Sequence, residues 1–354
     1  MTTPFVSVLI DTYNHERFIE QAILSALEQD FPAADREVLV VDDGSTDATP
    51  ELVRKFAPSV RLIRKPNGGQ GSAFNAGIPE CRGEIVSFLD GDDWWVPKKL
   101  SRVVPVLAAN PEIGTVGHGT IKVLPDGQQF TEVLKEDHRF SLRSLAGAHL
   151  FERRKSFLGT RTAIRAAILR QLLPIPETIR IEADEFVFTM AAALGEVEIL
   201  PEALFYYRLH TGNFYSQHGF DTESIRNKHR SIAQLAQSLA QRLPATGIPP
   251  EATRLVADAV RIEADQLRLS TGQGAPWETV RTELAIYRHL YLEPPWTHRL
   301  FKYITLLPAY FVPPRVYYSL RRRLAGAPWY LRLRQTFFAA PTPGHVHHSF
   351  TTRS

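Results

Sequence analysis

Residues 84–93 read EIVSFLDGDD, an apolar run that ends in three carboxylates within four positions. Like charges at this spacing repel one another, so a fold tolerates them best when a cation neutralises them. Carboxylate oxygens suit Mg²⁺ or Mn²⁺, and Gly91 lets the backbone turn closely around a ligand. The stretch therefore predicts a strand followed either by a metal site at these carboxylates or by a solvated acidic turn after an edge strand.

Three further apolar segments precede this one, and a helical pattern follows each of them. The strands are expected at residues 5–10, 38–41 and 60–63, ahead of the strand at 85–89. Asn14 is expected to cap the first helix. Nearly continuous apolar strands that alternate with helices predict an α/β fold with a parallel sheet covered on both faces.

In such sheets ligands bind at the carboxyl ends of the strands. Polar or glycine-rich segments follow all four predicted strands. These segments hold Thr12 and Tyr13, Asp42 and Asp43, residues 67–71, and residues 90–93. Four such loops on one edge predict a single ligand site.

The same segments resemble the family-2 glycosyltransferases, which have the GT-A fold. The matching pieces are VSVLIDTYN at 6–14, VVDDGSTD at 40–47, NGG at 67–69 through FNAG at 74–77, and LDGDD at 89–93. The resemblance is dense to about residue 100 and thinner to about residue 215. It implies a Rossmann-like mixed sheet, a nucleoside-diphosphate-sugar donor, a divalent metal, and transfer with inversion at the anomeric carbon.

The resemblance also implies roles for single residues. Thr12 and Tyr13 match positions that wrap the nucleotide, and Tyr13 can offer a ring face to the base. Asp90 is expected to face the ribose and the metal, while Asp92 is the more direct metal ligand. The expected donor-binding set is Thr12, Tyr13, Asp43, Gly69, Asp90 and Gly91, in which Asp43 accepts a hydrogen bond from the base or ribose.

Two residues near this set have open interpretations. Asp11 stands where many family members carry proline, and an extra carboxylate there could alter the preferred nucleotide. A surface strand end is the interpretation we favour for Asp11. Lys65, just before the glycine-rich turn, is either a second positive group for the phosphates or a solvated strand-end lysine, which is the commoner case.

An inverting transfer needs a base that takes the proton of the acceptor hydroxyl. Residues 181–186, IEADEF, open an apolar helix and resemble the acidic acceptor-side motif of the family. We predict Asp184 as the base, with Glu182 and Glu185 as alternatives. The other interpretation is that these acids complement the helix dipole in its first turn.

A third cluster, FYYRLHTGN at 205–213, resembles the end of the family's catalytic domain. His210 is a candidate metal ligand or diphosphate contact, with a structural hydrogen-bonded histidine as the alternative. Arg208 is expected to pair with a phosphate or with a carboxylate of the Asp184 helix. Of Trp94 and Trp95, one is expected in the core, and the other could stack on a sugar.

Length and spacing divide the 354 residues into segments. We expect a catalytic domain at 1–220, with a nucleotide-sugar half at 1–100 and an acceptor half at 101–220. A helical extension at 221–292, a basic aromatic segment at 293–340 and a tail at 341–354 follow. The lone Cys81, the absence of a signal peptide and the lack of a membrane-spanning run favour a cytoplasmic protein.

Basic charge gathers at the carboxyl-terminal end. From Pro294 onward there are nine lysines and arginines and no acid, which leaves 32 basic against 38 acidic residues in the rest of the chain. Basic residues interleaved with aromatic residues and leucine are typical of segments that lie on an anionic membrane surface. Peripheral contact with the inner face of the cell membrane is therefore expected, and a nucleic-acid partner is not.

Together these observations predict a metal-dependent inverting glycosyltransferase with a glycan or lipid-linked acceptor in envelope polysaccharide or glycolipid synthesis. Two rivals remain open. One is another metal-dependent nucleotide enzyme, such as a nucleotidyltransferase, which would need a stronger basic phosphate loop near the first strand. The other is a non-catalytic sugar-nucleotide-binding module that lacks the base.

Overall fold

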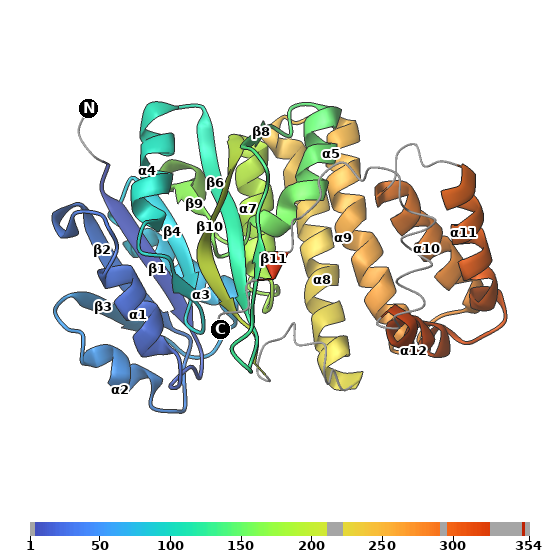
Figure 1. Ribbon diagram of the computed structural model, residues 1–354, viewed down its shortest axis with the longest axis horizontal. Coiled ribbons are helices and arrows are strands. Elements are labelled where there is room, and N and C mark those ends of the chain that lie inside the picture. Colours follow the sequence, from blue (N-terminus) through green and yellow to red (C-terminus); the bar gives the residue numbers. More distant parts are fainter. Residues whose placement is uncertain (1–3, 211–221, 291–295, 326–348, 351–354) are drawn as a thin grey trace. The chain divides into compact units, whose positions relative to one another are not determined.

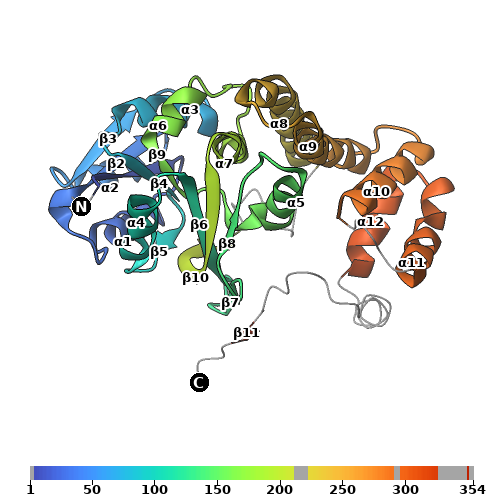
Figure 2. The same cartoon turned by 90° about the horizontal axis from the view of Figure 1, so that it is seen from above.

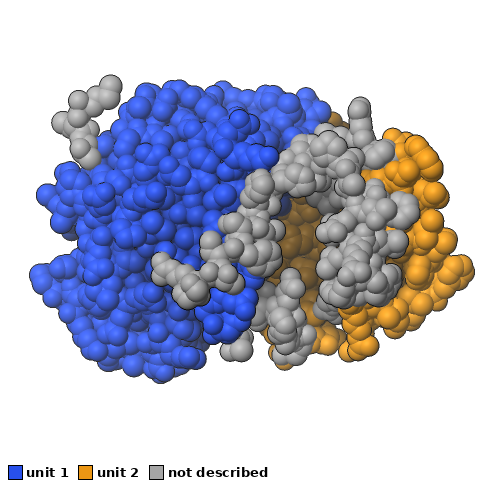
Figure 3. Space-filling view, in the orientation of Figure 1, with its two compact units in different colours: residues 1–216, 238–253, 346–354 blue, residues 217–237, 254–345 orange. Residues whose placement is uncertain are grey.

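The structure, a computed structural model, describes residues 4–210, 222–290, 296–325 and 349–350 (Figure 1). The chain forms two compact units, coloured separately in Figure 3. Unit 1 comprises residues 1–216, 238–253 and 346–354, and unit 2 comprises residues 217–237 and 254–345. The predicted boundary at residue 220 and most of the predicted tail at 341–354 lie outside the described residues.

Four parallel strands form the first half of the sheet of unit 1, as the alternating pattern predicts. They are β1 (Val6–Thr12), β2 (Arg36–Asp42), β3 (Val60–Arg64) and β4 (Ile85–Asp90), in the order β4-β1-β2-β3. Asp11 lies opposite Asp90 and Thr12 lies opposite Asp42 in the register. The carboxyl ends of these strands therefore meet at one edge, where the polar loops begin.

Helices cover both faces of this sheet because its strands carry apolar side chains on both faces. In Figure 2 one face carries α1 (Ile19–Leu27) and α4 (Lys99–Ala109), and the other carries α3 (Gln70–Gly77) and α6 (Ala166–Leu172). The short α2 (Thr49–Arg54) packs near α1. Fully burying each large apolar side chain contributes about 1.5–3 kcal/mol, so these two layers supply most of the stability of the sheet.

The second half of the sheet is mixed. It contains β5 (Trp94–Trp95), β6 (Ile113–Val123), β7 (Gln129–Glu132), β8 (His138–Phe140), β9 (Ala163–Arg165), β10 (Glu196–Arg208) and β11 (Ser349–Phe350). Strand β9 runs antiparallel between β4 and β6, while β10 is parallel to β6 and antiparallel to β5. The pairing of β10 with β5 brings residues after 205 to the acidic turn. Helices α5 (Leu145–Arg154) and α7 (Ala183–Leu194) complete the unit.

Two local expectations have definite outcomes. Trp95 is buried in the core, as one of the two tryptophans was expected to be, while the Trp94 ring stacks on Tyr206 at 4.8 Å between centroids. The cap assigned to Asn14 was wrong, because α1 begins only at Ile19. Asn14 instead has a φ of 56°, and its side-chain oxygen accepts a hydrogen bond from the Thr46 backbone at 2.8 Å. Asn14 thus joins the loops that follow β1 and β2 rather than starting a helix.

The remaining described residues are largely helical. Helices α8 (Thr222–Arg242) and α9 (Pro250–Ser270) contribute residues to both units, and α10 (Pro276–Leu290), α11 (Trp296–Leu306) and α12 (Pro314–Ala325) belong to unit 2. One side of α8 is buried at Ile232, Leu235 and Leu239. In the parts of the chain that the structure describes, no helix is long and apolar enough to span a membrane.

Candidate active site

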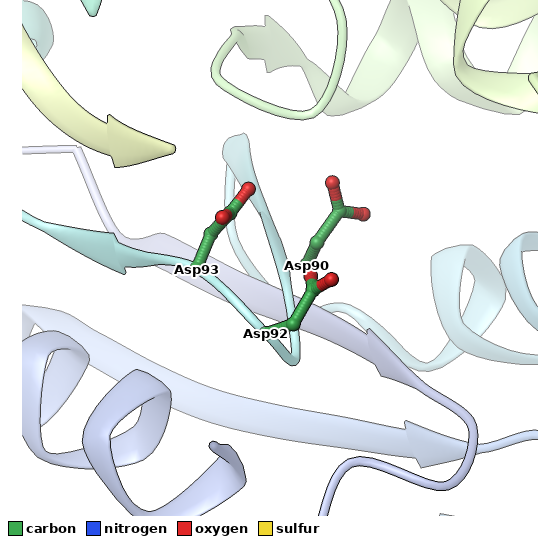
Figure 4. Close-up of side chains that lie close together, drawn as sticks. All are labelled: Asp90, Asp92 and Asp93. Atoms are coloured by element: carbon green, nitrogen blue, oxygen red, sulfur yellow. The ribbon is translucent and has the colours of Figure 1, made fainter. Parts of the chain in front are cut away.

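Three carboxylates converge in the turn between β4 and β5 (Figure 4). One carboxylate oxygen from each of Asp90, Asp92 and Asp93 lies within 4.8 Å of the other two. Asp90 accepts a 2.6 Å hydrogen bond from the Thr160 hydroxyl, and Asp93 accepts one of 2.7 Å from the Arg208 backbone. The acidic turn is thus held by partners from distant parts of the chain and is not a solvated loop.

Two histidines approach the same oxygen of Asp92. His210 Nε2 lies 3.0 Å from Asp92 Oδ2, and His15 Nε2 lies 3.9 Å from it. The Thr12 hydroxyl lies 3.1 Å from His15 Nδ1, which fixes the ring. Burial raises the pKa of Asp92, but the hydrogen bond from His210 and the two nearby imidazoles outweigh it and hold that pKa below its usual value. The structure therefore brings His210 to the predicted metal residue and adds His15, which carries no motif of its own.

Arg208 is anchored inside this cluster. Its Nε donates to the Asp92 backbone oxygen at 2.8 Å, and its Nη2 donates to Gln21 Oε1 at 2.6 Å. The guanidinium also lies over the Trp94 ring, 4.4 Å from its centroid. The expected pairing with a carboxylate of the Asp184 helix does not appear among these contacts, because β10 delivers Arg208 to the acidic turn.

Asp184 lies in the first turn of α7 and reaches the same edge of the sheet. A Cβ at Gly159 would lie 3.0 Å from Asp184 Oδ2, and Gly159 precedes Thr160, the hydrogen-bond donor to Asp90. Burial, together with the nearby charges of Asp90, Glu182 and Glu185, raises the pKa of Asp184 to about 8. The predicted base and the predicted metal residues therefore share one site. Gly159 and Thr160 were not predicted, since neither belongs to a recognisable motif.

Gln70 forms hydrogen bonds to several segments of this site. Its side-chain oxygen accepts a 3.2 Å hydrogen bond from the Asp184 backbone, and its side-chain nitrogen lies 3.4 Å from Asp11 Oδ2. Its own backbone nitrogen donates to the Arg180 oxygen at 3.1 Å. One residue at the start of α3 thus ties the end of β1 to the first turn of α7, where the predicted base lies.

The surface interpretation of Asp11 was wrong. Its Oδ1 is shielded from solvent and has no hydrogen-bond partner among the described residues. Burial raises the pKa of Asp11 well above its usual value, and the charges of Asp90 and Asp184 add to the rise. The sequence pattern suggests that this strand end is exposed. In the structure Asp11 instead faces the other two carboxylates, because Asp11 and Asp90 are register partners.

Asp43 organises the glycine-rich turn. Its carboxylate accepts hydrogen bonds from the backbone of Gly68 at 3.0 Å and of Gly69 at 2.7 Å. Lys65 Nζ lies 2.6 Å from the same group, so Lys65 is neither a solvated lysine nor an unpaired positive group. Gly69 has a φ of +87°, and a Cβ there would approach the Arg180 oxygen to 2.7 Å. A side chain at Gly69 would therefore push the turn away from the Asp184 segment.

The remaining predicted residues line the same edge. Thr12 is buried, whereas the Tyr13 side chain is 44% exposed and its ring can receive a ligand. A Cβ at Gly91 would lie 2.5 Å from Thr12 Oγ1 and 2.8 Å from His15 Nδ1. Gly91 therefore allows the acidic turn to approach the end of β1 closely.

The two alternative bases differ from Asp184 in their surroundings. Glu185 Oε1 forms a 2.9 Å ion pair with Lys155 Nζ. Glu182 is buried just before α7, with a left-handed φ of 62°. Both carboxylates add to the rise in the pKa of Asp184.

The acidic turn fits a divalent cation chemically. Burial and repulsion by Asp92 together raise the pKa of Asp90 to about 7. A cation at these two carboxylates would remove that repulsion, and carboxylate oxygens are the donors that Mg²⁺ and Mn²⁺ prefer. Asp90 and Asp92 are the residues that would hold it, with His210 beside them.

The raised pKa of Asp184 predicts a pH-dependent stability without divalent cations. Between its usual value and about 8, the folded protein holds a proton that the unfolded chain has released, so stability falls as pH rises. Asp184→Asn removes this loss, which is on the order of a few kcal/mol by pH 8. Thermal unfolding with a chelator at pH 5 and pH 8 should show a smaller decrease for the variant. Equal decreases in the two proteins would contradict the burial of this carboxyl.

Comparison with protein families identifies part of the chain directly. Residues 7–168 match the model of glycosyl transferase family 2. A Nostoc sp. protein described as an uncharacterized glycosyltransferase is 35% identical over 59% of this chain and 66% of its own length. The uncharacterized glycosyltransferase EpsJ of Bacillus subtilis is 32% identical over 58% of this chain and 61% of its own length. The chain thus spans about two thirds or less of these relatives.

Solved structures show the same fold. Staphylococcus aureus TarS 1–349 in complex with UDP-GlcNAc has a TM-score of 0.54 at 22% identity, over 86% of this chain and 91% of its own. The mannosyltransferase PcManGT of Pyrobaculum calidifontis, in complex with GDP-Man and Mn²⁺, has a TM-score of 0.55 at 22% identity, over 96% of this chain and 85% of its own. The mixed sheet flanked by helices is the GT-A fold. Residues 7–168 of this chain therefore form a glycosyl transferase family 2 domain.

Proposed function

We propose that this protein is a metal-assisted inverting glycosyltransferase that moves a sugar from a nucleoside-diphosphate-sugar to a hydroxyl of a glycan or lipid-linked acceptor. The ligands of two neighbours of the same fold, UDP-GlcNAc in TarS and GDP-Man with Mn²⁺ in PcManGT, support such a donor. A role in envelope polysaccharide or glycolipid synthesis rests on the resemblance of the amino-terminal half and on the basic carboxyl-terminal segment.

The donor nucleotide is assigned to the ends of β1 and β2. The exposed ring of Tyr13 offers a face for the base. Asp43 Oδ2 accepts the Gly69 hydrogen bond, and a carboxylate oxygen can accept a second hydrogen bond from a base or ribose. Thr12 and Gly91 complete the contact because they lie against each other at the end of the sheet.

The diphosphate is assigned to the acidic turn. A divalent cation held by Asp90 and Asp92 would stabilise the negative charge that develops on the leaving nucleoside diphosphate. His210 orients the Asp92 carboxylate through its 3.0 Å contact. Thr160 orients Asp90 in the same way.

The position of Asp184 is the observation that carries the proposal. Its carboxylate lies against Gly159, which directly precedes Thr160, and the Thr160 hydroxyl donates a hydrogen bond to Asp90. A carboxylate with a pKa near 8 has enough proton affinity to accept the acceptor hydroxyl's proton as that oxygen attacks the anomeric carbon. The ion pair between Glu185 and Lys155 favours Asp184 over Glu185 for this role. Gln70 holds the Asp184 backbone, and we therefore assign it as a positioning residue.

A thermal-shift screen of nucleoside diphosphates with Mn²⁺ present tests the donor assignment. The nucleoside diphosphate with the preferred base should raise the unfolding temperature clearly more than the others, since a ligand at 100 times its Kd adds about 2.7 kcal/mol of stability. The increase should fall sharply when the exposed ring is removed in Tyr13→Ala. As a control, Tyr303→Ala removes a similarly exposed tyrosine of unit 2 and should keep the full increase. No stabilisation by any nucleoside diphosphate would contradict the proposal.

The same preparation separates the rival activities. Release of pyrophosphate from a nucleoside triphosphate and a sugar phosphate would indicate a nucleotidyltransferase. Donor binding without any transfer or hydrolysis by the wild-type protein would indicate a binding module. The proposed enzyme instead releases nucleoside diphosphate from its sugar donor.

A further inference from the structure

Helix α11 carries large apolar side chains on a side that the described residues leave exposed. Trp296 is 74% exposed, and Phe311, just after the turn η5 (Leu307–Tyr310) that follows α11, is 84% exposed. The positions between them follow the spacing of one helical face. We call this the α11 surface; it consists of Trp296, Leu300, Tyr303, Ile304, Leu307 and Phe311, each at least 49% exposed.

On its opposite side α11 directs one charged side chain, that of Lys302, toward α10. Lys302 Nζ forms a 2.8 Å ion pair with Glu283 of α10, and Arg321 of α12 pairs with the same carboxylate. Glu283 is completely buried, and Phe301 and Leu306 are buried beside it. A surface helix normally turns its apolar side inward. Here the inward side holds a buried ion pair and the solvent side holds tryptophan, tyrosine and leucine.

The charged residues of α11 and α12 are all basic. Arg299 and Arg315 are exposed, and no acidic residue occurs from residue 294 to the end of the sequence. Glu283 compensates one of the two positive charges of Lys302 and Arg321. Two copies of the surface brought face to face would bring the exposed arginines of α11 and α12 near one another. A second copy of this chain is therefore a poor partner for it.

We propose that the α11 surface docks onto a lipid bilayer that carries anionic headgroups. Tryptophan and tyrosine favour the boundary between headgroups and acyl chains, and arginines beside them attract anionic lipid. A helix of 11 residues is too short to span a bilayer but can lie in its plane. Exposed apolar patches of this kind mark interaction sites rather than ordinary surface. This docking is independent of the transferase activity and does not rest on it.

Cosedimentation of the full chain with vesicles tests the proposal. The wild-type protein should bind vesicles of phosphatidylcholine mixed with phosphatidylglycerol and should bind pure phosphatidylcholine far more weakly. Arg299→Gln with Arg315→Gln should weaken anionic binding about thirtyfold, because each basic residue near the surface contributes about fivefold. The matched control Arg143→Gln with Arg153→Gln removes two exposed arginines of unit 1 and should bind like the wild type.

A second pair of variants isolates the apolar contribution. Trp296→Ser with Phe311→Ser should lower binding at least about tenfold at constant charge. Leu24→Ser with Leu145→Ser, two exposed leucines of unit 1, should not. Because these side chains are exposed, circular dichroism should show an unchanged fold. Failure of the wild type to bind anionic vesicles, or undiminished binding by the Trp296 and Phe311 variant, would overturn the proposal. So would a dimer in sedimentation velocity that Phe311→Ser dissociates while vesicle binding stays unchanged.

Discussion

Replacing Asp184 by asparagine is expected to leave donor binding intact while reducing turnover by about 10²- to 10⁴-fold, the usual contribution of a general base. The amide has nearly the shape of the carboxyl, so the contacts with Gly159 and Gln70 can persist. It cannot accept the proton of the attacking hydroxyl. Steady-state kinetics with the donor identified by the screen, together with calorimetry of donor binding, measures both quantities.

Glu185→Gln is the matched control for this substitution. It neutralises the next carboxylate of the same helical turn, whose partner is Lys155, and should reduce turnover only slightly. Full turnover by Asp184→Asn together with a large loss in Glu185→Gln would transfer the base role to Glu185. A loss in Glu182→Gln alone would assign it to Glu182. Either result would contradict the arrangement argued from Gly159 and Thr160.

Asp92→Asn should abolish the metal-dependent part of nucleotide binding. Even second-shell partners of metal ligands contribute 10- to 100-fold in affinity, so loss of the carboxylate should weaken nucleoside-diphosphate binding with Mn²⁺ by about 100-fold or more. Without a cation the variant and the wild type should bind the nucleotide equally weakly. Isothermal titration with and without Mn²⁺ measures the difference.

Asp126→Asn serves as the charge control, because this exposed carboxylate lies in the turn between β6 and β7. It should keep the Mn²⁺-dependent gain in affinity. An equal gain in Asp92→Asn would remove Asp92 from the metal site. The buried Asp93 would then be the next carboxylate to test, since it belongs to the same cluster.

Much of the site could be predicted from the sequence because its residues follow strands. Asp43, Asp90 and Asp92 each come at or just after the end of a parallel strand, and such strands share one edge. The same rule predicted the closeness of Thr12 to the acidic turn, which the Gly91 contact shows. His210 was placed near the turn by resemblance, and its 3.0 Å contact with Asp92 agrees with that placement.

Other contacts in the site join residues that are far apart in the sequence, and no local sequence pattern predicts them. Thr160 reaches Asp90 from a loop 70 residues further along the chain. Gln70 contacts Asp11, 59 residues before it, and Asp184, 114 residues after it. Asp11 was misjudged for the same reason, since its burial depends on residues brought in by α3 and α7. The inward turn of Lys302 likewise depends on Glu283, a buried partner that composition cannot reveal.

The central claim is that Asp184 activates the acceptor oxygen for direct attack at the anomeric carbon of a donor held at Asp90 and Asp92. The most direct test is ¹H NMR of the sugar first released when water replaces the acceptor, recorded before the anomers interconvert. A single displacement assisted by one base predicts a product with the anomeric configuration opposite to that of the donor. Release of the sugar with the donor's own configuration would contradict this account.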